Sequence, residues 1–388
     1  MKTQLTNSKE KIISIADKLI NGYSLHEAIN SDSDEYNIID KYKFFEHCEN
    51  TFSGIDETLI ELVKNPKITD IMINNDGNIW IDTNTGMEKT NIQISKEKAK
   101  EIAIKMASVC EKRLDNSVPI VDGTLPNGIR FNAILDPISP NGTCISLRLK
   151  TNIVPVFDEL FNSKTINYSS KEIIKKIVES KKSFLISGAT GTGKTTLLSA
   201  LTSLFDTHER VLFIEETKEI ISQHNNCVFL QSRDKNIENK GEITLSTLVH
   251  AAMRMRPDRI ILGECRGKEI ADILNAFNTG HEGGICTIHS NSVQDLPSRL
   301  LALGKLANLD IETISYQTYS AIKIVIHLNR QKIEGKIHRW ISQIGIFEID
   351  KYKLICTPCV HISHTGKITF LPKWEKLKEL INYENSTD

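Results

Sequence analysis

The sequence predicts an α/β fold with a parallel sheet, preceded by a smaller α+β domain. The chain has 388 residues, which is too long for one ordinary hydrophobic core, so two domains are expected. In the second half, short apolar strands alternate with helical segments, as they do around parallel sheets. One of these strands runs into a glycine-rich loop and then into a helix, between Phe184 and Leu204.

The first part of the chain divides into two predicted regions. Residues 1–54 are expected to form accessory helices, because apolar residues recur there at helical spacing before the acidic patch NSDSDEY. Residues 55–150 show the mixed pattern of an α+β domain. Its expected elements are a helix over 57–64, strands over 69–73 and 78–81, a helix over 96–114, and strands over 131–135 and 144–149.

Residues 151–170 are predicted to be the linker, because they contain a proline, scattered polar residues and little periodicity. Residues 171–388 are then the α/β domain, which is expected to end in helices and a hairpin. Its predicted parallel strands are 184–186, 211–214, 260–262 and 285–288.

Charge and cysteine content narrow the possible functions. The chain has 48 basic and 49 acidic side chains, so no overall field would hold nucleic acid or an anionic membrane. Its eight cysteines are mostly far apart in apolar runs, as expected for buried residues in a reducing compartment such as the cytosol. No apolar stretch reaches the ~18 residues of a membrane span, and the run MKTQLTNSKEK has no apolar segment after its lysine that would predict a signal peptide. We expect a cytoplasmic protein without direct membrane insertion, which reaches a membrane through a partner.

The glycine-rich loop is the most specific chemical signal in the chain. Strand, loop and helix follow one another in the order that lets backbone N–H groups surround phosphate oxygens at a helix N-terminus. Lys194 is expected to reach the β- and γ-phosphates, and the Thr195 hydroxyl to bind Mg²⁺. The expected cofactors are therefore ATP and Mg²⁺. The predicted nucleotide-binding residues are Gly188, Ala189, Thr190, Gly191, Thr192, Gly193, Lys194, Thr195 and Thr196.

ATP hydrolysis further requires a group that orients or deprotonates water. Glu264 is the first candidate, because it follows the predicted strand 260–262 at the sheet edge beside the loop. The preceding position, where an ATP-binding strand usually carries aspartate, holds Gly263. A second strand ends in Glu215 and Glu216, so three acids would converge on one Mg-ATP, with Glu264 and Glu215 as metal ligands. The alternative is that these are ordinary solvated charges or acids favoured by a helix N-terminus.

Two histidines flank the predicted strand 285–288. His281 precedes this strand and His289 follows it. Two histidines beside one strand of a phosphate-binding sheet suggest a role in catalysis, although either could simply bond a carbonyl group. The spacing offers no third ligand for a metal site of histidines.

Near the end of the chain, cysteine and histidine residues occur with a composition that resembles a zinc site. The residues are Cys356, Cys359, His361 and His364. They crowd into nine residues of an alternating pattern followed by the turn-like HTGK, which favours a hairpin with incidental cysteines. Zinc binding stays open as the alternative.

Residues 236–292 closely resemble the CpaF/TadA-like branch of the type II/type IV secretion ATPases. The matching runs are NIENKGEITLSTLVHAAMRMRPDRIILGECRG and NTGHEGGICTIHSNS, and further back TDIMINNDGNIWID, VDGTLPNGIRFNA and CISLRLK. The motifs occur in the family's order over roughly residues 55–328. The resemblance implies a RecA-like ATPase domain after a PAS-like domain, with ATP between them. It also implies a homohexameric ring that drives pilus assembly or secretion on an inner-membrane platform protein.

The resemblance also implies roles for particular residues. The loop from Gly188 to Thr195 matches the Walker A motif, and Ile260 to Glu264 resembles the Walker B motif, so Gly263 is a trait of the family. Ile214, Glu215 and Glu216 match the acidic box, usually Ile-Glu-Asp; the departure leaves open which glutamate acts, and we favour Glu215.

Other matches carry cationic groups. His281 and His289 match the histidine box. Arg130 and Arg148 match first-domain arginines that approach the γ-phosphate on domain closure, although an ordinary ion pair is the alternative for Arg148. For four further arginines the sequence leaves open whether they face the nucleotide or a neighbouring subunit. They are Arg233, Arg254, Arg256 and Arg266.

Three functions are compatible with these residues. The first is an ATPase motor of a Tad-type (type IVc) pilus or related secretion system, which the NIENKGE segment favours over a conjugative one. The second is conjugative type IV secretion, or a RecA-like motor that translocates nucleic acid; the balanced charge and the lack of a basic-aromatic tract argue against nucleic-acid binding. The third is a nucleotide-gated scaffold without turnover.

Overall fold

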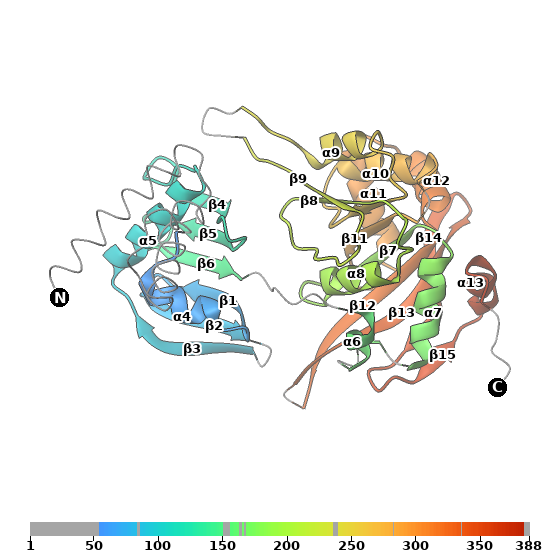
Figure 1. The fold of residues 1–388 in the computed structure, drawn as a ribbon, viewed down its shortest axis with the longest axis horizontal. Helices are drawn as coiled ribbons and strands as arrows, with labels where there is room; N and C mark the ends of the chain where they lie inside the picture. Colours follow the sequence, from blue (N-terminus) through green and yellow to red (C-terminus); the bar gives the residue numbers. More distant parts are fainter. Residues whose placement is uncertain are drawn as a thin grey trace, which may run out of the picture. The chain divides into compact units, whose positions relative to one another are not determined.

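A computed structural model describes residues 54–83, 86–149, 156–162, 165–166, 168–235, 240–281, 283–334 and 336–383. The predicted accessory helices lie outside these ranges, apart from Gly54. The chain divides into two compact units, Met1–Thr151 and Asn152–Asp388 (Figure 1). No helix in the described part of the chain is long and apolar enough to cross a membrane.

The described part of the first unit contains an antiparallel sheet of six strands in the order β3-β2-β1-β6-β5-β4. The strands are β1 (Ile68–Ile73), β2 (Asn78–Thr83), β3 (Gly86–Gln93), β4 (Ile120–Thr124), β5 (Arg130–Ile134) and β6 (Cys144–Arg148), and the helices are η1 (Glu57–Leu59), α4 (Ile60–Lys64) and α5 (Lys96–Val109). The pattern did not predict β3 and β4, which form the two edges. Edge strands bury less surface, so their apolar alternation is weak.

Helix α5 is shorter than the predicted helix over 96–114. It begins after Ser95, whose hydroxyl accepts a hydrogen bond from the backbone N–H of Lys98. It ends at Val109 because Glu111 adopts a left-handed conformation, with φ of 55°, which terminates a helix. Its buried face packs in the core of this unit and consists of Ala99, Ile102, Ala103, Met106 and Ala107.

The described part of the second unit contains a sheet of nine strands in the order β15-β14-β13-β12-β7-β11-β10-β8-β9. The strands are β7 (Phe184–Gly188), β8 (Val211–Glu215), β9 (Cys227–Gln231), β10 (Arg259–Leu262), β11 (Ile285–His289), β12 (Ile324–Ile333), β13 (Lys336–Asp350), β14 (Lys353–Ile362) and β15 (Ile368–Phe370). The helices are α6 (Phe157–Asn162), α7 (Tyr168–Glu179), α8 (Lys194–Leu201), η2 (Thr202–Leu204), α9 (Leu245–Ala252), α10 (Glu269–Asn278), α11 (Leu296–Leu306), α12 (Ile311–Ala321) and α13 (Trp374–Leu380).

The α/β fold is confirmed, but the sheet is mixed rather than wholly parallel. Neighbouring strands pair in parallel along the part of the sheet β12-β7-β11-β10-β8-β9. Along the remaining part, β15-β14-β13-β12, neighbouring strands pair antiparallel. The connection from β12 to β13 is too short for the crossover of a dozen or more residues that parallel strands need. The predicted linker contains α6, whose Phe157 and Leu160 are buried in the core of the second unit.

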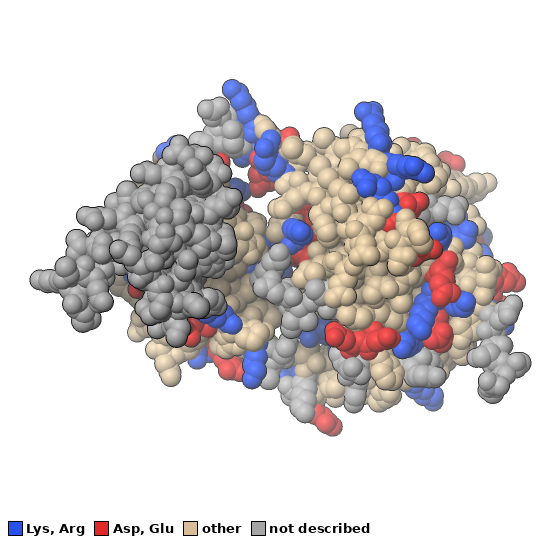
Figure 2. Space-filling view, in the orientation of Figure 1, with Lys and Arg blue, Asp and Glu red and all other residues tan. Residues whose placement is uncertain are grey.

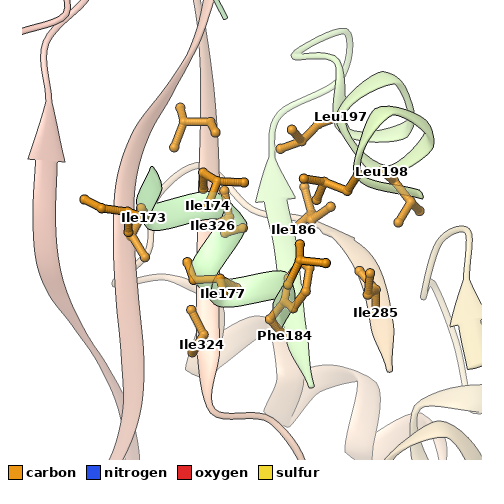
Figure 3. Close-up of a cluster of buried hydrophobic side chains, with 14 of the residues drawn as sticks. Ile173, Ile174, Ile177, Phe184, Ile186, Leu197, Leu198, Ile285, Ile324 and Ile326 are labelled. Carbon is orange, nitrogen blue, oxygen red and sulfur yellow. The ribbon is translucent and has the colours of Figure 1, made fainter. Parts of the chain in front are cut away.

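Hydrophobic side chains cover both faces of this sheet. Along β7, Phe184 and Ile186 join the cluster that contains α7 and α8, whereas Leu185 joins the cluster that contains α9 to α12. Figure 3 shows part of the first cluster, with Ile177 of α7 between Ile324 of β12 and Phe184 of β7. Burial on both faces explains why the central strands read as continuous apolar runs.

The predicted C-terminal hairpin is confirmed by β14 and β15, which pair antiparallel. Cys356 and Cys359 of β14 belong to different core clusters on the two faces of the sheet, so they cannot bind one ion together. Burial raises the pKa of both thiols, that of Cys359 to about 12, which disfavours the thiolate a metal requires. In the described residues no group of three or more His, Cys, Asp or Glu side chains could hold a metal ion.

Candidate functional site

The glycine-rich loop leaves the carboxyl end of β7, in the middle of the sheet, and enters α8. It turns through Gly191 and Gly193, whose φ angles of 73° and 93° place them in the left-handed region. Thr192 stabilises the turn, since its hydroxyl donates to the carbonyl oxygen of Ala189 at 2.8 Å. Thr195 and Thr196 follow in the first turn of α8, half-buried and exposed respectively.

The Lys194 side chain folds back onto the start of this loop. Its ammonium group donates to the carbonyl oxygens of Gly188 at 3.0 Å and Ala189 at 3.1 Å, and lies 3.1 Å from His289 Nδ1. Burial lowers the pKa of Lys194 to about 8; Glu264 opposes this shift and Arg266 adds to it. The ammonium group is therefore still mostly charged at neutral pH, in a loop whose backbone can accept an anion.

Strand order brings the candidate residues to one edge of the sheet. Neighbours β8, β10, β11 and β7 are parallel, so their carboxyl ends meet at the start of the loop. The register places His289 of β11 opposite Gly188 and Leu262 of β10 opposite Ile214 of β8. The expectation that two strands end in acids at the same edge is thereby confirmed.

Glu264 connects Lys194, through His289, with Arg266. Its Oε1 lies 2.6 Å from His289 Nε2, and its Oε2 accepts a hydrogen bond from Arg266 Nη2 at 2.6 Å. Burial and then Lys194 lower the pKa of His289, so its imidazole is neutral at pH 7. In the tautomer with the proton on Nε2, Nδ1 can accept from Lys194 while Nε2–H faces the carboxylate.

Gly263 is explained by the side chain of Glu215. A Cβ at Gly263 would lie 2.8 Å from Glu215 Cγ, closer than real contacts allow. Glu215 Oε1 accepts hydrogen bonds from the backbone N–H groups of Glu219 at 3.1 Å and Ile220 at 3.0 Å. Burial raises the pKa of Glu215 to about 7, although these hydrogen bonds oppose the shift. Glu215 thus occupies the space that an aspartate at position 263 would need.

Glu216 is exposed and reaches the site through Arg266. Its Oε2 accepts from Arg266 Nη1 at 3.4 Å, so one guanidinium bridges Glu216 and Glu264. The Glu264 carboxylate raises the pKa of Arg266 further. Among the four unassigned arginines, Arg266 is therefore part of the site, whereas Arg233 donates to the carbonyl oxygen of Gly241 in a loop. Arg254 and Arg256 are exposed beyond the end of α9.

Three predicted site residues are not part of this cluster around Lys194. One lies at the other edge of the same sheet, and two belong to the first unit. His281 precedes β11 and lies at its amino end, opposite to the end that carries His289. Arg130 and Arg148 belong to the first unit, where they are directly opposite on β5 and β6. Arg148 Nε lies 3.2 Å from Asp70 Oδ1, and the approach of both arginines to a phosphate stays a prediction.

The oxygen donors beside the loop fit Mg²⁺. Glu264 Oε1 is buried and receives no hydrogen bond of acceptable geometry within the described residues, and the Thr195 hydroxyl follows Lys194 in α8. Carboxylate and hydroxyl oxygens are ligands that Mg²⁺ accepts, usually together with water and substrate phosphates. Glu215 fits less well, because its Oε1 already accepts two backbone hydrogen bonds.

One contact to the loop was not predicted from any motif. Arg339 of β13 donates through Nε to the carbonyl oxygen of Gly191 at 2.9 Å, across 148 positions of sequence. The neighbouring Arg330 of β12 also approaches Gly191. No spacing in the sequence indicates this contact, because it arises from the place of β12 beside β7.

Comparison with known proteins gives consistent matches. Residues 54–384 match the family model described as "Type II/IV secretion system protein". A putative conjugal transfer protein of Mycobacterium tuberculosis is 35% identical over 291 residues, covering 73% of this chain and 82% of that protein. The conjugal transfer protein TrbB of Rhizobium radiobacter is 32% identical over 264 residues, covering 67% and 77%. The ATPase DotB of Legionella pneumophila shares the fold with a TM-score of 0.51 at 22% identity, covering 74% of this chain and 79% of that one.

Proposed function

We propose that this chain, which belongs to the type II/IV secretion system protein family, is an ATP-hydrolysing motor of a pilus or secretion machine. The observation that carries this proposal is the contact of Lys194 and Glu264 with the two ring nitrogens of His289 at the carboxyl edge of three neighbouring strands. In this arrangement the cation can bind the phosphates of ATP, and the carboxylate can activate the attacking water.

The chemistry follows from the positions of the side chains. On nucleotide binding, the Lys194 ammonium exchanges its two carbonyl partners for β- and γ-phosphate oxygens. Glu264 takes a proton from the attacking water: Arg266 donates a hydrogen bond to its Oε2, while Oε1 lies beside His289 Nε2 and receives no hydrogen bond within the described residues. Mg²⁺ bound at Thr195 and Glu264 would neutralise charge on the phosphates. Arg130 or Arg148 supplies a further cation when the first unit closes.

We propose that six copies of the chain form a ring in the cytoplasm, attached to an inner-membrane platform protein. The NIENKGE segment supports a Tad-type pilus or related secretion system as the machine. Conjugative type IV secretion is the second candidate, because the two similar proteins carry conjugal transfer names. The chain itself is not expected to bind nucleic acid: on the face visible in Figure 2, basic side chains of the second unit lie in small groups beside acidic ones.

Lys194→Ala tests the ATPase. The variant should lose ATP binding and hydrolysis by about 100-fold or more, because no other cation replaces the ammonium between the loop carbonyls. Lys176→Ala is the control, since it removes a lysine of α7 whose side chain is 43% exposed and pairs with Glu179. Hydrolysis at the wild-type rate by Lys194→Ala contradicts the proposal. Strong stimulation of the wild-type ATPase by DNA would instead favour nucleic-acid translocation, and normal function of Glu264→Gln in the cell would favour a scaffold.

A further inference from the structure

The hairpin of β12 and β13 continues past the carboxyl end of β7. β12 pairs with β7 as far as Leu328, which lies opposite Gly188. β12 pairs with β13 along its whole length, and its residues from Asn329 onward extend beyond the edge from which the phosphate loop starts. Figure 1 shows the two long strands running on together from the sheet. The far part of this hairpin therefore stands beside the loop.

Two arginines of the hairpin contact Gly191 at the tip of the loop. Arg339 Nε donates to its carbonyl oxygen at 2.9 Å. The guanidinium of Arg330 lies where a side chain at position 191 would be, since a Cβ there would meet Arg330 Nη1 at 2.7 Å. With φ of 73°, Gly191 provides both the left-handed turn and the space that admits Arg330.

The hairpin brings two guanidinium groups together beside the loop. Arg330 and Arg339 are directly opposite each other in the antiparallel ladder, so both side chains lie on the same face of the hairpin. Like charges at such positions destabilise a sheet. Arg330 is exposed, and within the described residues its side chain makes no ion pair with a carboxylate. The charge of Arg330 therefore lies beside the loop, where an anion would compensate it.

We propose that Arg330 is a further phosphate-binding residue, which contacts the α- and β-phosphates of the nucleotide held by the loop of the same chain. This inference rests on the proposed function. The loop backbone cradles the α- and β-phosphates, and Arg330 lies against that backbone at Gly191. A guanidinium suits this contact because its planar fork bonds two phosphate oxygens at once. Arg339 is a positioning residue, whose bond to Gly191 fixes the hairpin against the loop.

Binding of fluorescent ATP and ADP to the full chain tests this assignment. Arg330→Ala should weaken both nucleotides by about 3- to 10-fold, as expected for an exposed charge-assisted hydrogen bond. Arg330→Lys should give an intermediate loss, because it keeps the charge without the fork. The matched control is Lys332→Ala, which removes an exposed cation two positions further along β12 and should leave both affinities unchanged.

Steady-state kinetics give a second readout for Arg339. Arg339→Ala should raise KM with little change in kcat, because a correctly placed hairpin stabilises the bound substrate and the transition state equally. An unchanged KM together with a lowered Tm would reduce Arg339 to a structural residue and overturn its part of the proposal.

Other outcomes overturn the contact of Arg330. Equal losses of affinity in Arg330→Ala and Lys332→Ala would mean that both cations act only through long-range electrostatic attraction. A loss of affinity for ATP but not for ADP would place the contact at the γ-phosphate. If wild type binds ATP, Lys194→Ala does not, and Arg330→Ala binds like wild type, only the hairpin proposal fails. If wild type and Lys194→Ala bind ATP equally, the proposed function itself fails.

Discussion

At the residue scale, Glu264 is placed to act on water. Its side chain is 23% exposed, it lies at the end of β10, and each of its oxygens faces a different cationic or imidazole group. Glu264→Gln should retain ATP binding and lower kcat by about 100- to 1000-fold, because the amide cannot accept a proton. Isothermal titration and a phosphate-release assay measure the two effects.

Glu216→Gln is the matched control for this substitution. Glu216 contacts the same Arg266 but is 50% exposed, so its loss should change kcat little. Substantial residual hydrolysis by Glu264→Gln would transfer the general-base role to Glu215.

Glu215 makes stability depend on pH. Its pKa is raised from 4.5 to about 7 by burial. Between these values the folded chain holds a proton that the unfolded chain has released, so the free energy of unfolding falls as pH rises through this window. Glu215→Gln keeps an oxygen acceptor for both backbone N–H groups but does not titrate.

The stability of Glu215→Gln relative to wild type should therefore increase between about pH 5 and about pH 8, by on the order of 2–3 kcal/mol. Urea unfolding followed by circular dichroism at both pH values measures this difference. Parallel pH profiles for the two proteins would show that the carboxyl group titrates normally.

At the element scale, a buried ion pair joins α7, β10 and the loop before β11. Arg259 at the start of β10 donates to Glu209 at 2.6 Å, to the carbonyl oxygen of Val178 at 3.2 Å and to that of Gly283 at 3.2 Å. The Arg259 and Glu209 side chains are only 3% and 6% exposed, so water cannot replace these bonds. This cluster fixes the amino edge of the sheet, opposite to the nucleotide edge.

Arg259→Leu should lower the free energy of unfolding by about 3 kcal/mol or more, because it leaves the Glu209 carboxylate buried with less compensation. Lys181→Ala serves as the control: Lys181 contacts the same carboxylate at 2.7 Å but is 56% exposed, so its removal should cost less than about 1 kcal/mol. Similar urea midpoints for the two variants would mean that the pair is not tightly coupled to folding.

At the scale of the whole molecule, catalysis is expected to need both units. Arg148 of the first unit is 55% exposed and pairs with Asp70, which lies opposite it on the neighbouring strand β1. Arg148→Ala should lower kcat by at least about 10-fold while ATP binding is retained, if closure brings this cation to the γ-phosphate. A phosphate-release assay and a binding titration on the full chain measure these effects.

Arg113→Ala is the matched control for Arg148→Ala. Arg113 lies in the same unit, is 56% exposed and also pairs with an aspartate, Asp115. Equal rates for the two variants would contradict a catalytic role of Arg148 and leave it as an ordinary surface ion pair.

The sequence alone determined the features that depend on neighbouring residues. The phosphate loop was predictable because its chemistry lies in nine consecutive residues between a strand and a helix. The four predicted parallel strands, β7, β8, β10 and β11, were predictable because burial on both faces makes them uniformly apolar. The pattern did not predict β12, although the half of it that pairs with β7 is equally buried. The edge strands β3, β4 and β9 were not predicted, since partial exposure weakens the same pattern.

Only the tertiary structure decided which distant residues meet. It placed His289 between Lys194 and Glu264, filled the space beside Gly263 with Glu215, and put His281 at the far end of β11. The physical reason is strand order: β7 lies between β11 and β12, so residues separated by a hundred positions or more become neighbours. Periodicity determines which face of a strand is buried, but it carries no information about which strand lies beside it.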